Sequence, residues 1–206
     1  MIKSENGGGP QDLVHQMKLS SPQERVRLLL NFMEEKGQGY YDEVVTQLEH
    51  GLQCAALAEK TGAGKELLVS ALLHDIGHLL VDEQNIKEGF LEQDLSHEEL
   101  GADFLKAFFP AKITEPIRLH VPAKRYLCTT NRNYYEGLSD ASKRSFVIQG
   151  GNLSKQEIAE FESNPALDDS LKIRIWDDQA KVSGCTTPTL TYYSDIIQQC
   201  MLDEPA

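Results

Sequence analysis

Hydrophobic positions recur along most of the chain at the spacing of amphipathic helices. Residues 21–24 (Ser-Pro-Gln-Glu) begin the first of these helices, with a capping serine, a proline at the first helical position and a glutamate three residues after the cap. Residues 37–39 end this helix, and a second helix is expected at about 42–60. The apolar stretch 67–80 predicts a third helix, which should lie at the centre of the core.

The second half of the chain continues the helical pattern. Ser96 with Glu99, and Ser154 with Glu157, have the spacing of capping boxes. Further helices are expected at about 96–110, 114–120, from 154, at 168–182 and at 189–201. No strand pair and no internal repeat is apparent. The pattern therefore predicts an all-α fold, a single compact helical bundle over residues 21–202, with a flexible N-terminus (1–20) and a loose tail (203–206).

Composition narrows the classes of partner. The chain has 206 residues, of which 40% are hydrophobic and 25% charged, as expected for one globular domain. Its formal net charge of -12 argues against nucleic acid as the main partner. A small anionic substrate remains compatible with this charge, because a local basic pocket can exist on an acidic surface.

The cysteines and the N-terminal sequence indicate the cellular compartment of the protein. The four cysteines are far apart and form no CxxC pair, as expected of reduced thiols in the cytoplasm. Residues 1–11 are polar and glycine-rich, without the apolar centre of a signal peptide. No apolar run is long enough to span a membrane. We therefore expect a cytoplasmic protein with no membrane partner.

Six residues offer metal ligands: His50, His74, Asp75, His97, His120 and Asp177. Four imidazoles and two carboxylates are enough for two metal ions, and this mixture suits hydrolysis or oxygen chemistry. Asp75 lies in a strongly apolar helix, where an ionised carboxylate is costly unless it is paired or binds metal. His78, one turn after His74, shares its face and is either a further site residue or a core histidine.

These residues carry a family resemblance. His50, the His74-Asp75 doublet and Asp177 resemble the HD-domain superfamily of helical metal-dependent phosphohydrolases and related enzymes. The additional His97, His120-x3-Lys124 and Arg174-x2-Asp177 resemble its phosphonate-degrading mixed-valent di-iron oxygenases, of the 2-amino-1-hydroxyethylphosphonate oxygenase type. The resemblance covers about residues 40–177.

The resemblance implies a ligand set and a cofactor. His50, His74, Asp75 and Asp177 would hold one iron, and Asp75, His97 and His120 the other, with Asp75 as the bridge. The pair would be Fe(II)/Fe(III), with O2 as co-substrate. The second iron would keep open positions for the substrate and O2.

Substrate contacts are expected beside the ligands. Lys124 lies one turn after His120 and Arg174 three residues before Asp177, so both cations should reach a phosphonate group. The resemblance adds His78, Ser142 and Ser145 as further contacts. It also gives Tyr40 the open iron site before substrate binds, and Glu43 the substrate ammonium. Tyr40 and Tyr41 could instead form a partial cage for a methylated ammonium, so the head group stays open.

The implied activity is O2-dependent cleavage of the C–P bond of 1-hydroxy-2-aminoethylphosphonate, or of its N-methylated form, releasing phosphate and glycine or betaine. An upstream 2-oxoglutarate-type hydroxylase would be a partner in the pathway only. The main alternative is a metal-dependent HD phosphohydrolase acting on a nucleotide or phosphomonoester. A catalytically silent module and an oxygenase of an inositol-like sugar are further alternatives. The physiological metal and the oligomeric state are left open by the sequence.

Overall fold

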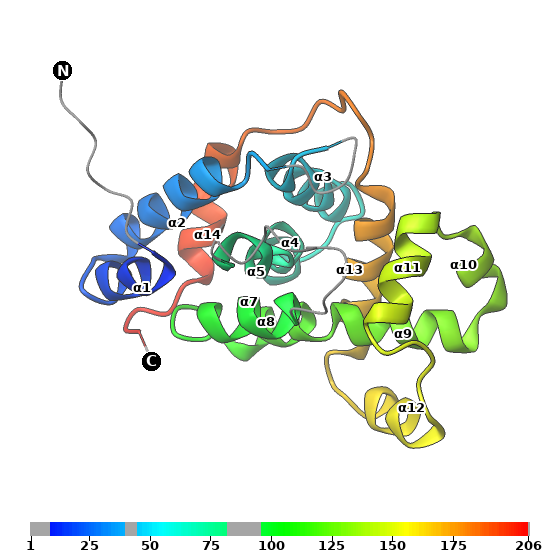
Figure 1. The fold of residues 1–206 in the computed structure, drawn as a ribbon. Coiled ribbons are helices and arrows are strands. Elements are labelled where there is room, and N and C mark those ends of the chain that lie inside the picture. The colour runs from blue at the N-terminus through cyan, green and yellow to red at the C-terminus, as the bar shows by residue number, and fades with distance from the viewer. Residues whose placement is uncertain (1–8, 40–44, 82–95, 206) are drawn as a thin grey trace.

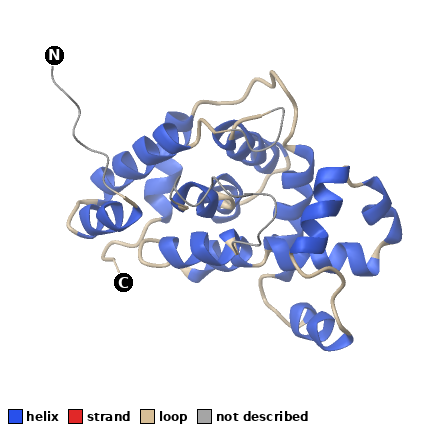
Figure 2. Ribbon diagram, in the orientation of Figure 1, coloured by secondary structure: helices blue, strands red, loops and turns tan. Residues whose placement is uncertain are grey.

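The computed structural model describes residues 9–39, 45–81 and 96–205, and these form helices joined by loops, with no strand in the described ranges (Figures 1 and 2). In these ranges the chain forms, in order, α1 (Pro10–Lys18), α2 (Pro22–Lys36), α3 (Gln47–Lys60), α4 (Lys65–Leu73), α5 (Ile76–Leu80) and α7 (His97–Leu105). The others are α8 (Ala111–Arg118), α9 (His120–Thr130), α10 (Arg132–Gly137), α11 (Asp140–Ile148), α12 (Lys155–Glu162), α13 (Leu167–Gln179), the 3-10 helix η1 (Leu190–Tyr193) and α14 (Ser194–Cys200). The predicted all-α class is confirmed. None of these helices is long and apolar enough to cross a membrane.

Helix α4 is the centre of the bundle, as its apolar sequence predicts. Every residue from Leu67 to Leu73 is buried, and the helix contacts α3, α8, α13 and α14. Figure 1 shows α4 and α5 in the middle of the molecule, with α10, α11 and α12 together at one end, beyond α13 and α9. A helix that is apolar on all sides is stable in water only when other helices surround it.

The expected continuous helix over 67–80 is wrong. Helix α4 ends at Leu73 and α5 begins at Ile76, with Asp75 between them at φ −100° and ψ 12°. In a continuous helix, the consecutive side chains of His74 and Asp75 would point about 100° apart. Nothing in the apolar pattern marks the break, because residues 67–80 contain no proline and only one glycine, Gly77.

Gly77 sets the distance between α5 and α7. A Cβ atom at this position would lie 1.9 Å from the carbonyl oxygen of His97, so only glycine fits. On the other side of the contact, a Cβ at Gly101 would lie 3.1 Å from the Gly77 nitrogen. The close backbone approach holds the first residue of α7 against the break that contains Asp75.

The predicted flexible N-terminus and loose tail need correction where they are described. Residues 10–18 form α1, in which Met17 is fully buried. The buried Arg25 donates to the Met17 carbonyl at 3.1 Å and to the carbonyls of Leu202 and Asp203 at 3.0 Å each. The tail is thus anchored to α2, because these backbone carbonyls satisfy a buried guanidinium.

The helix starts follow the predicted capping signals in two of three cases. Ser154 and Glu157 form a complete capping box, and Ser21 accepts a hydrogen bond at the start of α2. The predicted box at Ser96 is wrong, because this residue adopts a left-handed conformation (φ 46°) and its side chain makes no capping bond. Thr46 starts α3 with a capping box that the sequence analysis did not identify.

The first prediction concerns Gly77. Gly77→Ala should lower the free energy of unfolding by about 3 kcal/mol or more, because the added Cβ overpacks against backbone. Urea denaturation measures this change. Gly137→Ala is the matched control, since its Cβ would meet no atom within 4 Å. Equal stability of the two variants would contradict the packing argument.

Candidate metal centre

The six predicted ligands converge on one buried site. They come from α3, the α4–α5 break, the first residues of α7 and α9, and α13. All six are buried, with at most 7% of each residue exposed: His50, His74, Asp75, His97, His120 and Asp177. Residues up to 127 positions apart in sequence therefore meet in the interior.

Asp75 lies between two pairs of histidines. Its Oδ2 is 3.4 Å from Nε2 of His50 and 3.4 Å from Nε2 of His74. Its Oδ1 is 3.3 Å from Nε2 of His97 and 3.4 Å from Nε2 of His120. Neither oxygen has a hydrogen-bond partner among the described residues. A buried carboxylate without hydrogen bonds is costly, so each oxygen calls for a cation.

Hydrogen bonds at Nδ1 fix the ring orientations of three histidines. Nδ1 of His50, His74 and His120 each faces a backbone carbonyl, which can only accept a hydrogen bond, so Nδ1 carries the proton. The acceptors are Ala180 at 2.8 Å, Ala71 at 2.9 Å and Ile117 at 2.7 Å. Nε2 is then the atom that binds a proton or a metal ion. Metal-binding histidines are typically oriented in this way.

The Nε2 atoms face one another within each pair. They are 3.3 Å apart for His50 and His74, and 3.0 Å apart for His97 and His120. Two lone pairs repel at this distance unless a cation lies between them. Two ligands that each bind one ion at about 2.1 Å can be this far apart. The residues present thus fit a metal-binding site on either side of Asp75.

Asp177 makes the two sides unequal. Its Oδ1 is 3.3 Å from Nε2 of His50, and its Oδ2 is 3.8 Å from Nε2 of His74. One side therefore has four candidate ligands, His50, His74, Asp75 and Asp177. The other has three, Asp75, His97 and His120. A side with fewer protein ligands leaves positions for a substrate.

Burial and the neighbouring groups of opposite charge shift the pKa values of the pocket residues in different directions. Burial opposes the charge on Asp75, but the surrounding imidazoles, His74 first, hold the pKa of this carboxyl well below its usual value. Burial also opposes protonation of His97, yet contact with Asp75 raises its pKa. At His74 burial prevails and lowers the pKa to about 4. An ionised carboxylate and a neutral imidazole are the forms that bind metals.

His78 lies against the three-ligand side. Its ring stacks on His97, with centroids 3.9 Å apart and planes 16° apart. Burial lowers the pKa of His78 to about 3, so the ring is neutral. The predicted substrate contact is thus next to a candidate ligand, while His78 belongs to none of the groups that could hold a metal.

Lys124 and the two predicted serines lie together. The buried Lys124 donates from Nζ to Ser145 Oγ at 2.6 Å and to Gln149 Oε1 at 3.2 Å. Ser145 Oγ donates to the carbonyl of Ser142 at 3.1 Å. Burial, followed by the charge of Arg174, lowers the pKa of Lys124 to about 8. Gln149 was not among the predicted contacts.

Arg174 lies beside the ligand Asp177, as its spacing predicts. Nη1 of this buried guanidinium is 2.5 Å from Asp177 Oδ2. The guanidinium also pairs with Asp178, which the sequence analysis did not identify. Lys181, one turn after Asp177, is a further cation at 4.0 Å from Asp177 Oδ1. Two cations, Arg174 and Lys181, thus lie beside the candidate ligand Asp177.

Two further neighbours of the histidines were missed. The buried Cys54 has its Sγ 3.9 Å from Nε2 of His50, one helical turn earlier. Glu98 Oε2 is 3.5 Å from Nδ1 of the adjacent His97. At His50, His74 and His120, a backbone carbonyl faces Nδ1 instead. The sequence signals for these two residues are the four-residue spacing of Cys54 from His50 and the position of Glu98 directly after His97. The predicted Tyr40 and Glu43 lie outside the described residues.

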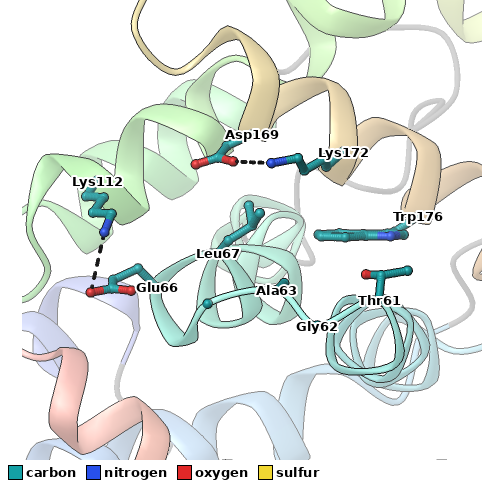
Figure 3. Close-up of a pocket in the computed structure, with 10 residues that line it drawn as sticks. Thr61, Gly62, Ala63, Glu66, Leu67, Lys112, Asp169, Lys172 and Trp176 are labelled. Atoms are coloured by element: carbon teal, nitrogen blue, oxygen red, sulfur yellow. Dashed lines mark hydrogen bonds and ion pairs between the residues drawn. The ribbon is translucent and has the colours of Figure 1, made fainter.

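A surface pocket on another face of α13 is a different site (Figure 3). Trp176 and the loop 61–64 line it, and both of its lysines are paired with carboxylates. Lys112 is 3.7 Å from Glu66, and Lys172 is 3.0 Å from Asp169. Because these charges are compensated locally, the pocket is a weaker anion site than the region around Lys124.

The second prediction concerns metal content. His120→Ala removes one of three candidate ligands on one side only, so this variant should hold one ion per chain where the unsubstituted protein is expected to hold two. Asp75→Asn should lose both ions, because each oxygen faces one histidine pair. Mass spectrometry of metals after desalting measures this, and His15→Ala, an exposed histidine, is the control. Equal metal content in all four proteins would contradict the assignment.

Comparison with known proteins agrees with this geometry. The HD domain family matches residues 48–140. The chain is 50% identical over 181 residues to the hydroxymethylphosphonate dioxygenase of Gimesia maris, covering 88% of this chain and 90% of that protein. It is 42% identical over 165 residues to the glycine-betaine-forming [1-hydroxy-2-(trimethylamino)ethyl]phosphonate dioxygenase of Leisingera caerulea, covering 80% of this chain and 83% of that protein. The chain therefore belongs to the HD-domain family, alongside relatives that are phosphonate dioxygenases.

Proposed function

We propose that this protein is a di-iron dioxygenase that cleaves the C–P bond of a small 1-hydroxyphosphonate. The observation that carries the proposal is the position of Asp75, with one histidine pair at each carboxylate oxygen. The names of two relatives that align over most of the chain support the reaction class. The phosphohydrolase alternative finds no comparable support among them.

His50, His74, Asp75 and Asp177 would hold one iron, and Asp75, His97 and His120 the other. Mixed imidazole and carboxylate ligands suit iron. The bound pair would supply the redox chemistry that uses O2 to oxidise the carbon bearing the hydroxyl group. The protein supplies the burial and the fixed ring orientations, so that both ions are held in a site protected from water.

Lys124 and Arg174 would bind the phosphonate group of the substrate. Lys124 provides a point charge, and Arg174 a planar fork suited to phosphonate oxygens. Ser145, in contact with Lys124 Nζ, and Ser142 of the same helix would complete the oxygen contacts. His78, neutral and stacked on His97, would orient the substrate next to the three-ligand side.

The reaction balances with O2 as the only oxidant. A 1-hydroxyphosphonate and O2 give a carboxylate, phosphate and one proton, so the C–P bond breaks and the carbon is oxidised. The group on that carbon is kept in the product, as in the betaine named for one relative. Tyr40, Tyr41 and Glu43 would recognise this group, be it hydrogen, an aminomethyl group or its trimethylated form. A hydroxylase of the 2-oxoglutarate type would supply the 1-hydroxyphosphonate.

The third prediction tests the activity. Iron-loaded protein should release phosphate in air from hydroxymethylphosphonate, 1-hydroxy-2-aminoethylphosphonate or its N-trimethyl form, and should release none under argon. The substrate with the highest kcat/KM identifies the head group. Hydrolysis of simple phosphomonoesters under argon, with no release from any hydroxyphosphonate, would contradict the proposal and favour the phosphohydrolase.

The fourth prediction concerns Lys124. Its lowered pKa of about 8 means that Nζ is charged below this pH and loses its charge above it. KM for the phosphonate should therefore rise as the pH passes through 8. Lys124→Arg keeps the charge at higher pH and should remove this rise. Lys124→Ala should increase KM by about 10-fold or more, with unchanged iron content. A wild-type KM profile identical to that of Lys124→Arg would contradict a role for the Lys124 charge.

A further inference from the structure

Tyr134 belongs to α10, at the end of the molecule formed by α10, α11 and α12 (Figure 1), and its side chain contacts Asp178 of α13. Its hydroxyl donates a short hydrogen bond to Asp178 Oδ2. Asn131 caps α10 and accepts from the backbone nitrogen of Tyr134 at 3.2 Å, so the backbone at Tyr134 is fixed. Burial raises the pKa of Tyr134, which keeps the hydroxyl protonated as a donor.

Asp178 connects this hydroxyl to Arg174. Nη2 of Arg174 pairs closely with Asp178 Oδ1, and Nε lies 3.3 Å from Asp178 Oδ2. The third nitrogen, Nη1, is 2.5 Å from the candidate ligand Asp177. A continuous set of hydrogen bonds and ion pairs thus joins Tyr134, Asp178, Arg174 and Asp177.

The hydroxyl of Tyr134 takes part in these hydrogen bonds, whereas its ring does not. The ring packs on the small apolar cluster of Cys128, Leu138 and Phe146, beside Tyr135. Loss of the hydroxyl alone would leave this packing intact. It would also leave Asp178 without one of its donors, and the side chain would then be freer to rotate together with the guanidinium that it holds.

An arginine that binds an anion gains affinity when its plane is fixed beforehand, because its flexible chain otherwise loses conformational freedom on binding. Asp178 fixes the plane of Arg174, and Tyr134 fixes Asp178. We propose that Tyr134 is a positioning residue which, through Asp178, orients Arg174 for the phosphonate group of the substrate. This inference rests on the proposed function.

The direct comparison is between Tyr134→Phe and Tyr135→Phe, neighbours on the same helix. Binding of methylphosphonate to the iron-loaded protein under argon is measured by calorimetry, and KM and kcat are measured with the best hydroxyphosphonate in air. For Tyr134→Phe we expect the methylphosphonate Kd and the substrate KM to rise about 5- to 20-fold. Its kcat, iron content and melting temperature should stay at wild-type values. Tyr135→Phe should match wild type in every readout.

A double variant tests the route through Arg174. In a protein that already carries Arg174→Lys, adding Tyr134→Phe should change the methylphosphonate Kd less than about twofold. The planar guanidinium that Tyr134 orients is absent from this protein. An equal effect of Tyr134→Phe in both backgrounds would overturn the inference, as would a wild-type Kd in the single variant. A parallel fall of iron content and melting temperature would also overturn it, by making Tyr134 a structural residue. Absence of O2-dependent phosphate release by the wild type would instead overturn the proposed function.

Discussion

The charge of Asp75 is the constraint around which the structure is organised. An ionised carboxylate in an apolar interior is strongly unfavourable unless cations compensate it. Its two oxygens have no hydrogen-bond partner in the described part of the chain, and each faces two imidazole nitrogens. This arrangement is costly for the protein without metal ions. It is suited to two metal ions that share one carboxylate.

The fold delivers the ligands through local backbone features. A break between α4 and α5 turns His74 and Asp75 toward one point, which a continuous helix would not do. Gly77 lets α7 approach so closely that His97 reaches the other oxygen of Asp75. Helix α13 then carries Asp177 and Arg174 on one turn, so a candidate ligand and a candidate cation for the substrate lie together.

The sequence allowed the ligand set to be predicted, because histidines and an aspartate stand out in apolar helical segments and match a family pattern. It did not reveal the helix break, since residues 67–80 contain no proline, and their only glycine, Gly77, lies after the break. Gln149, Asp178 and Tyr134 were also missed. Each contacts a partner from another part of the chain or from a neighbouring turn, and polar residues in such positions look like ordinary surface residues until the packing is known.

The central claim is that two metal ions share Asp75. Anomalous X-ray diffraction at the iron absorption edge, on crystals of iron-loaded protein, tests it most directly. Two anomalous peaks are expected, one between His50 and His74 and one between His97 and His120, with Asp75 contacting both. A single peak, or a pair of peaks elsewhere in the molecule, would contradict it.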